Sequence, residues 1–210
     1  LVHTYAKSKE SKTVTRTINY HQPDGSVETV TQPVELTRVV TTDNVDQSKQ
    51  FDPWTTSQWE AKATPAIGGY TASQSSVAET PVDGATQDQV VDISYTADGQ
   101  TAIVKIYDDT TGQLLRQASL TGKTGEAINF SEGNQQLVAY LAKGYALAVA
   151  GNGDLTNGQF NPVNFDDADT ADQEFAAHLV HTYAKSSESK TITRTINYHQ
   201  PDGSVETVTQ

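Results

Sequence analysis

Alternating apolar and polar side chains define the first clear element of the chain, at residues 13–20. Val14, Ile18 and Tyr20 fall on one face, and Thr13, Thr15, Thr17 and Asn19 fall on the other. A period of two residues is typical of a β-strand. Pro23, Asp24 and Gly25 then supply turn chemistry, and the alternation resumes in residues 27–40. The pattern predicts a β-hairpin, with Pro33 at an edge or a bulge because proline has no amide hydrogen.

Shorter strand patterns follow, up to a break at Asp98 and Gly99. A polar connection at residues 41–49 precedes short strands at residues 54–63 and 67–72, which are interrupted by Pro65 and by Gly68 and Gly69. A longer strand is expected at residues 89–96. No segment of this half has a convincing helical period, and Asp98-Gly99 predicts a domain boundary.

The second half combines strands with one helix. Strands are expected at residues 102–107, 113–120, 145–149 and 173–183, with loops at residues 108–112, 121–125 and 151–158. Leu137, Val138 and Leu141 recur at helical spacing, so we expect a helix over residues 134–143, capped by Ser131 and ended by Gly144. A hairpin, a helix and further strands follow one another in a β-grasp fold. The pattern therefore predicts a strand-dominated α+β chain of two tandem β-grasp-like (ubiquitin-like) domains in an elongated arrangement.

The two ends of the chain carry nearly the same sequence. Residues 1–32 and 179–210 differ only at Lys9 against Ser187 and at Val14 against Ile192. The offset of 178 residues (179 − 1) indicates one period of a tandem array of folded domains. We expect residues 1–11 to end a preceding repeat, residues 12–98 and 99–186 to form two domains, and residues 187–210 to start the next repeat.

Composition narrows the possible partners. The chain has 14 basic and 26 acidic residues, a net charge of −12, which repels nucleic acids and anionic membranes. It has no cysteine and no methionine, so disulfides, zinc–thiolate sites and cysteine nucleophiles are excluded. No stretch is long and apolar enough to insert into a membrane. A soluble, hydrated surface is the simplest interpretation of the acidity.

No sequence pattern indicates a catalytic site, so we do not expect the protein to be an enzyme. Gly122, Lys123 and Thr124 resemble part of a phosphate-binding loop, but Gln117 stands where that loop requires glycine. No nucleophilic serine turn is present. His178 and His181 lie three apart on a strand and therefore face opposite sides, which disfavours a shared metal.

Two groups of residues are candidates for binding. Asp166, Asp167 and Asp169 are close enough in sequence to hold calcium, although a solvated acidic loop is the alternative. Trp54, Trp59 and Tyr70 lie in one stretch and could stack on sugar rings, although aromatic residues of a small β-domain commonly belong to its core. No cofactor is expected apart from this possible calcium.

The second domain contains four distinctive segments, at residues 103–115 (IVKIYDDTTGQLL), 120–128 (LTGKTGEAI), 143–145 (KGY) and 178–184 (HLVHTYA). Through these segments it resembles the mucin-binding protein (MucBP) domain of Gram-positive surface adhesins. The first domain resembles its companion in lactobacillus-type mucus-binding repeats, through residues 15–26 (TRTINYHQPDGS), Trp59, Pro65, Gly69-Tyr70 and residues 91–96 (VDISYT). The resemblance implies extracellular, wall-attached adhesins of β-grasp-like modules that bind mucus glycoproteins.

Three functions are compatible with this resemblance. The first is a unit of a multivalent adhesin, in which weak binding of mucin glycans by each repeat is raised by avidity. The second is a protein-binding module that recognises immunoglobulins, as some related β-grasp modules do, through an exposed strand edge. The third is a passive stalk spacer between neighbouring repeats.

Overall fold

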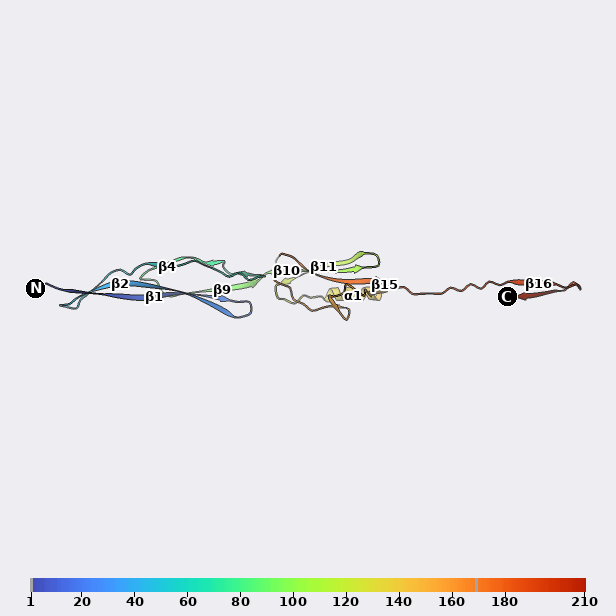
Figure 1. Cartoon of the computed structure of the whole chain (residues 1–210), viewed down its shortest axis with the longest axis horizontal. Helices are drawn as coiled ribbons and strands as arrows, with labels where there is room; N and C mark the ends of the chain where they lie inside the picture. Colours follow the sequence, from blue (N-terminus) through green and yellow to red (C-terminus); the bar gives the residue numbers. More distant parts are fainter. Residues whose placement is uncertain (1, 169) are drawn as a thin grey trace.

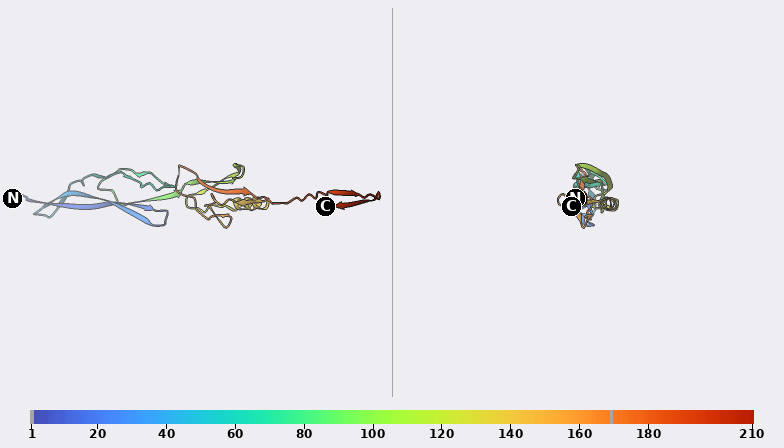
Figure 2. Two further views of the ribbon diagram at one scale, coloured as in Figure 1. Left: turned by 45° about the vertical axis from the view of Figure 1, so that its right-hand side comes forward. Right: turned by 90° about the vertical axis from the view of Figure 1, so that its right-hand side faces the viewer.

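The structure is a computed structural model that describes residues 2–168 and 170–210. It is elongated, with two domains in a row followed by an extended segment and a terminal hairpin (Figure 1). Seen down the long axis, both ends of the chain lie near that axis (Figure 2). The expected strand-dominated α+β fold with two domains is confirmed.

A long hairpin is the centre of the first domain. Strands β1 (Tyr5–His21) and β2 (Val27–Asp43) pair antiparallel along their whole length, from Tyr5↔Asp43 to His21↔Val27. The five-stranded sheet has the order β3-β2-β1-β9-β6, with β3 at Lys49–Phe51, β6 at Tyr70–Ala72 and β9 at Gln89–Ala97. The strand β9 runs parallel to β1 and antiparallel to β6.

The beginning of β1 corrects one expectation. Tyr5 to Ser11, expected at the end of a preceding repeat, pair in unbroken register with Thr37 to Asp43 of β2. No turn residue interrupts the segment, so the strand continues through it. At the other end, the hairpin turn forms as expected: Asp24 Oδ1 accepts hydrogen bonds from the Ser26 amide (2.8 Å) and hydroxyl (2.7 Å), and Gly25 has a φ of 86°.

Short strands replace a helix over one face of the first sheet. They are β4 (Ser57–Trp59), β5 (Lys62–Ala63), β7 (Ser76–Val77) and β8 (Thr80–Val82), paired β4 with β8 and β5 with β7. Two apolar clusters lie beneath them: Val14, Leu36, Trp59 and Val82, and Ile18, Tyr20, Val77 and Ile93. Burial of such side chains stabilises the fold by roughly 25 cal/mol per Å² of apolar surface.

The second domain has the same sheet order with a helix added. Its sheet is β11-β10-β15-β12, with β10 at Gly99–Asp108, β11 at Gln113–Lys123, β12 at Tyr145–Leu147 and β15 at Gln173–His181. As in β2-β1-β9-β6, a hairpin is followed by a last strand parallel to its first strand. The small hairpin of β13 (Leu155–Thr156) and β14 (Gln159–Phe160) turns at Asn157 and Gly158, both at positive φ.

The helix α1 (Ser131–Ala142) begins earlier than expected. Ser131 is its first residue instead of its cap, and the Asn129 side chain accepts the Ser131 amide hydrogen bond at 3.0 Å. Gly144 follows at a φ of 97°, which confirms it as the stop. Leu137 is the fully buried helical side chain, and it joins a core with Ala102, Val104, Ile106, Ile128, Phe130, Phe160, Phe165, Ala177 and Leu179.

The second copy of the repeated sequence joins a domain sheet only at its start, where Leu179, Val180 and His181 end β15, and its later residues pair with neither domain. Residues 183–194 extend away from the second domain, and β16 (Thr195–His199) and β17 (Val205–Thr209) form a separate hairpin. In the first copy, residues 5–15 pair with residues 33–43, and the sequence contains no second copy of that partner segment. The same sequence therefore has different pairing partners in its two copies.

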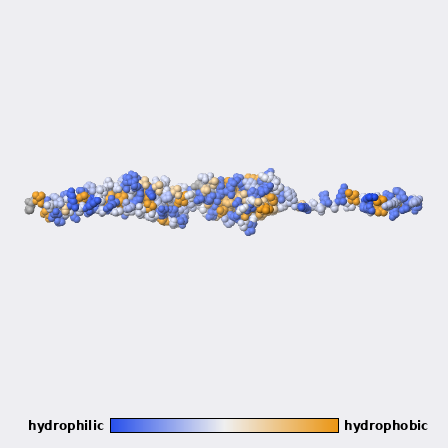
Figure 3. Space-filling model, in the orientation of Figure 1, coloured by the Kyte–Doolittle hydropathy of each residue, from blue (hydrophilic) through white to orange (hydrophobic). Residues whose placement is uncertain are grey.

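Hydrophilic residues predominate on the surface shown in Figure 3, with small hydrophobic areas scattered among them. Within the described residues, no helix has the length and apolar character needed to cross a membrane.

Candidate functional site: a groove between the two domains

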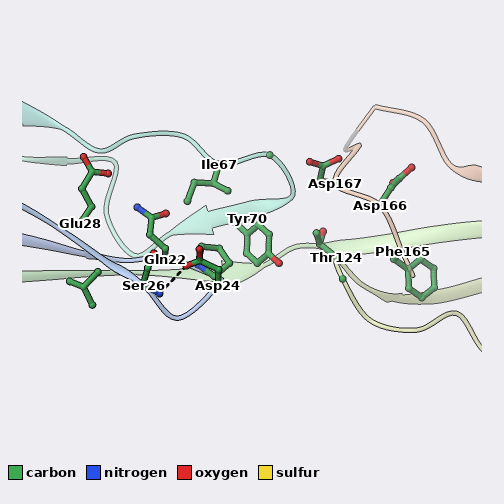
Figure 4. A pocket seen from close by; sticks show the side chains of 14 residues that line it. Gln22, Asp24, Ser26, Glu28, Ile67, Tyr70, Thr124, Phe165, Asp166 and Asp167 are labelled. Carbon is green, nitrogen blue, oxygen red and sulfur yellow. Dashed lines mark hydrogen bonds between the residues drawn. The ribbon is translucent and has the colours of Figure 1, made fainter. Parts of the chain in front are cut away.

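A groove of about 960 Å³ lies where the two domains meet (Figure 4). The first domain contributes the tip of the β1–β2 hairpin, the loop before β6 and the start of β6, and the second contributes the turn that follows β11 and a loop before β15. The lining residues are Gln22, Pro23, Asp24, Ser26, Val27, Glu28, Ile67, Gly68, Tyr70, Thr124, Gly125, Phe165, Asp166 and Asp167.

Direct hydrogen bonds hold the two walls of the groove together. Asp98 is the single residue between β9 and β10, and its amide donates to the Gly69 carbonyl at 2.9 Å. The Asp98 carbonyl accepts from the Thr124 amide at 3.0 Å, and its carboxylate accepts from the Thr71 hydroxyl at 2.6 Å. One residue is thus tied to both domains, which restricts their relative motion.

Close backbone approach at Gly69 completes this joint. Gly69 has a φ of 70°, and a Cβ placed there would lie 2.7 Å from Thr124 side-chain atoms and 2.9 Å from the Asp167 Cα. Any larger residue would collide with the second domain as well as strain the backbone. Gly69 therefore allows the two walls to meet.

Tyr70 is the aromatic side chain at the centre of the groove. The strand β6 fixes its backbone through pairing with Ala97 of β9, and the side chain is partly exposed. A Cβ on Gly125 would lie 3.6 Å from the Tyr70 hydroxyl, which places the phenol beside the second domain. The ring can stack on a sugar while its hydroxyl forms a hydrogen bond.

Phe165 anchors the opposite wall. Its ring packs so closely against Gly122 that a Cβ there would collide with the ring, and its carbonyl accepts a hydrogen bond from the Gly125 amide at 2.9 Å. The next amide, of Asp166, donates to the Gln173 side chain at 3.0 Å. These contacts fix the loop that presents Asp166 and Asp167 to the groove.

The groove is strongly acidic. Asp24, Glu28, Asp166 and Asp167 line it, and none of the described lining residues is basic. Hydrogen bonds from the Ser26 hydroxyl and amide hold the pKa of the Asp24 carboxyl below its ordinary value, so this group is ionised at neutral pH. Carboxylates accept hydrogen bonds from hydroxyl groups and repel anions, so the groove suits neutral, hydroxyl-rich ligands.

The structure separates the three aromatic candidates. Trp59 is in the core, only 2% exposed, so its ring has no free face for a sugar. Trp54 is partly buried against the apolar cluster that contains Trp59. Lys12 Nζ lies 5.5 Å and Arg38 Cζ lies 4.6 Å from the centroid of the Trp54 ring. Tyr70 alone among the three lines the groove.

The calcium candidates are only partly described. Asp166 and Asp167 lie side by side on the groove wall, whereas Asp169 lies outside the described residues. Within the part of the chain that the structure describes, no three acidic or histidine side chains are grouped in a way that could hold a metal. Calcium binding at this loop stays a prediction.

The two histidines of β15 bind different aspartates. His178 Nδ1 lies 2.8 Å from Asp109 Oδ1, and His181 Nε2 lies 2.9 Å from Asp108 Oδ2. Burial opposes ionisation of Asp108, but hydrogen bonds from Thr111, the Thr110 amide and His181 hold the pKa of its carboxyl below the ordinary value.

The hairpin turn of the first domain is the part of the groove that sequence reasoning missed. Residues 22–28 are separated by about a hundred positions from the loop they face, and no local pattern links them. The Pro-Asp-Gly sequence identifies the turn but says nothing of what the turn approaches.

Two family models match adjoining parts of the chain. A Muc B2-like domain matches residues 5–99, and a mucin binding domain matches residues 100–181. The border between them falls one residue from the predicted break at Asp98-Gly99. No curated protein matches the chain.

Several solved structures are similar to part of the chain. The mucin-binding domain of a Streptococcus pneumoniae protein is 29% identical, with 44% of this chain and 96% of that one covered and a TM-score of 0.41. A MucBP domain from Lactobacillus acidophilus is 28% identical, with 45% and 100% covered and a TM-score of 0.41. A MucBP domain of an adhesion protein from Pediococcus pentosaceus is 31% identical, with 41% and 99% covered and a TM-score of 0.34.

Proposed function

Because the chain belongs to the mucin-binding domain family, with a Muc B2-like domain preceding its mucin binding domain, we propose that it binds mucin glycans in the groove between these domains. The observation that carries the proposal is the position of Tyr70, a partly exposed ring in a groove that four carboxylates also line. Aromatic stacking with surrounding hydrogen-bond acceptors is the usual chemistry of sugar recognition.

The charge of the groove indicates which glycans it accepts. Sialylated and sulfated sugars are anions, and the carboxylates of Asp24, Glu28, Asp166 and Asp167 would repel them at short range. Neutral hexoses and N-acetylhexosamines present hydroxyls that can donate to the same carboxylates. We therefore expect neutral mucin glycans to bind, and enzymatic removal of sialic acid from mucin should increase binding.

Substitution of Tyr70 tests the site. Tyr70→Ala removes the stacking surface and should weaken binding to immobilised mucin by about tenfold or more, since a stacked aromatic contributes about 1–3 kcal/mol. Tyr198→Ala is the matched control, because Tyr198 is an exposed tyrosine of the terminal hairpin, far from the groove. Equal loss in both variants, or loss in neither, would exclude the groove as the glycan site.

Tandem repetition suits weak binding by each unit. The period of 178 residues places one groove in every repeat, so an array carries many equal sites. Linked sites raise avidity by about 10²–10⁴ where the geometry permits simultaneous engagement. A chain of several repeats should bind mucin far more tightly than one repeat, and equal affinity per molecule would contradict the multivalent adhesin.

A strand edge favours the alternative of an immunoglobulin partner. The strand β11 lies at the edge of its sheet, and its 11 residues form the longest edge strand of the second domain. Unpaired backbone groups of such an edge can accept a strand from another protein. Deglycosylation of the partner distinguishes glycan binding in the groove from protein binding at the β11 edge. Binding should be lost in the first case and retained in the second. Failure to bind either mucin or immunoglobulin would favour the spacer.

The shared strand order supports a β-grasp classification of both domains. In each domain an antiparallel hairpin is followed by a last strand parallel to its first strand, and a further short strand pairs antiparallel with that last strand. The helix between hairpin and later strands is present only in the second domain.

We further propose that the repeat is displayed outside a Gram-positive cell and attached to its wall, in keeping with a mucus ligand.

A further inference from the structure

The repeated sequence places a His-Thr pair at two positions, and the two copies have different neighbours. His3 and Thr4 contact the first domain that follows them, whereas His181 and Thr182 contact the second domain that precedes them. In a continuous array one His-Thr pair would have both neighbours. The two copies therefore show the two halves of one repeat-to-repeat junction.

The first copy shows the downstream half. His3 Nδ1 lies 2.5 Å from Asp43 Oδ2 at the end of β2. The Asn44 amide donates to the Thr4 carbonyl at 2.9 Å, and the Asn44 side-chain amide donates to the Thr4 hydroxyl at 3.0 Å. The Asp43 side chain is 8% exposed, while that of His3 is 50% exposed, so one side of the ring is open.

The second copy shows the upstream half. His181 Nε2 lies 2.9 Å from Asp108 Oδ2, and the His181 amide donates to the Thr110 hydroxyl at 2.8 Å. The Thr182 amide and hydroxyl both donate to the Gly144 carbonyl, at 3.1 and 2.6 Å. The Asp108 side chain is 3% exposed and that of His181 is 36% exposed.

The two sets of contacts use different atoms. The downstream half uses Nδ1 of the imidazole and the threonine carbonyl, and the upstream half uses Nε2 and the threonine amide. The threonine hydroxyl donates upstream and accepts downstream, which one hydroxyl can do at once. We propose that the end of the second domain is an interaction surface for the next repeat, whose Asp43-Asn44 corner docks on the shared His-Thr pair.

Protonation of the histidine should strengthen this junction. A neutral imidazole has one N–H and can donate to one carboxylate, whereas an imidazolium can donate to both Asp108 and the downstream Asp43. The other titratable groups that face His181 are the phenols of Tyr145, edge-on at 5.2 Å, and of Tyr183, at 6.3 Å between ring centroids.

The test uses a chain extended so that residues 33–99 follow Gln210 once more, which restores a complete downstream first domain. The chain has no cysteine, so a single spin-label pair can be placed at exposed Val138 on α1 and at the downstream equivalent of exposed Val90. The label-to-label distance distribution should be narrow at about pH 5 and broader at about pH 8, the range over which imidazole side chains lose their charge.

Two variants and a control decide the interpretation. Asp43→Asn, made only in the downstream copy, and His181→Gln should each broaden the distribution at about pH 5 at least twofold. His3→Gln is the matched control, because His3 precedes the upstream first domain and takes no part in this junction. The proposal is overturned if both variants keep the unsubstituted distribution, or if the unsubstituted chain is equally broad at both pH values. Separate unfolding transitions of each domain confirm that the variants remain folded.

Discussion

At the scale of single residues, Arg16 shows how position decides the role of a side chain. It is fully buried on the same face as the apolar residues of β1. Its guanidinium donates to the Gln32 side chain at 2.8 Å and to the carbonyls of Ala78 and Glu60, both at 2.7 Å, and it lies 5.5 Å from the Trp59 ring. The side chain thus links the hairpin to the loops that cover it.

Loss of this guanidinium should destabilise the first domain. Arg16→Met removes a charged donor from two partly buried hydrogen bonds to backbone carbonyls and should lower the free energy of unfolding by about 3 kcal/mol in a urea titration. Arg194 is the same residue in the second copy and is exposed, so Arg194→Met should leave stability within about 0.5 kcal/mol. Similar losses in both variants would contradict the linking role of Arg16.

Alanine substitutions at three glycines distinguish the cost of backbone strain from the cost of a steric collision between the two domains. Gly69→Ala combines a positive φ with contact below 3 Å to Thr124 and Asp167, and it should cost more than about 1 kcal/mol of stability. Gly112→Ala has the positive φ but open space, and should cost about 1 kcal/mol. Gly99→Ala has neither and should be close to neutral. A Gly69 variant no less stable than the Gly112 variant would argue against a close-packed joint.

At the scale of secondary-structure elements, local patterns predicted the two long hairpins, the helix and the strand segments at residues 54–63 and 67–72, where β4, β5 and β6 form, but not β7 and β8. The strands β7 and β8 have two and three residues, too few for a period to be recognised. Their positions depend on the sheet beneath them. The groove has the same limitation, since Tyr70 was identified by residue type while its neighbours come from distant segments.

Among the side chains of the helix, Leu137 should contribute most to the stability of the second domain. Leu137 is 0% exposed, whereas its neighbour Val138 is 58% exposed. Leu137→Ala should lower the free energy of unfolding by about 2–5 kcal/mol because it leaves a cavity in the core. Val138→Ala should change stability by less than about 0.5 kcal/mol. Thermal unfolding of the two variants checks the assignment of the buried face, which equal effects would refute.

The loop between β10 and β11 should weaken in acid. The pKa of Asp108 lies below its ordinary value of 3.8, so its hydrogen bonds contribute stability above that pH and lose it as the pH falls through the folded-state pKa. Asp108→Asn should flatten the fall in stability of the second domain between about pH 5 and about pH 2, measured by urea unfolding. Glu188→Gln, at an exposed position outside both domains, should leave that fall intact.

At the scale of the whole molecule, nearly continuous strands account for the elongated shape. One residue, Asp98, separates β9 from β10, and one residue, Thr182, separates β15 from the segment that corresponds to β1. The first domain thus passes its last strand directly into the second domain. In a tandem array, which the repeated sequence predicts, each period of 178 residues would add one rod of two domains and one groove.

The most direct test of glycan binding in the groove is a titration of the isotope-labelled chain with neutral mucin oligosaccharides, followed by amide chemical shifts. We predict that the largest shifts lie on both walls of the groove, at Tyr70, Thr124, Gly125 and Asp167, while β11 and the terminal hairpin are unchanged. Shifts confined to the β11 edge, or no shifts at saturating oligosaccharide, would contradict the account.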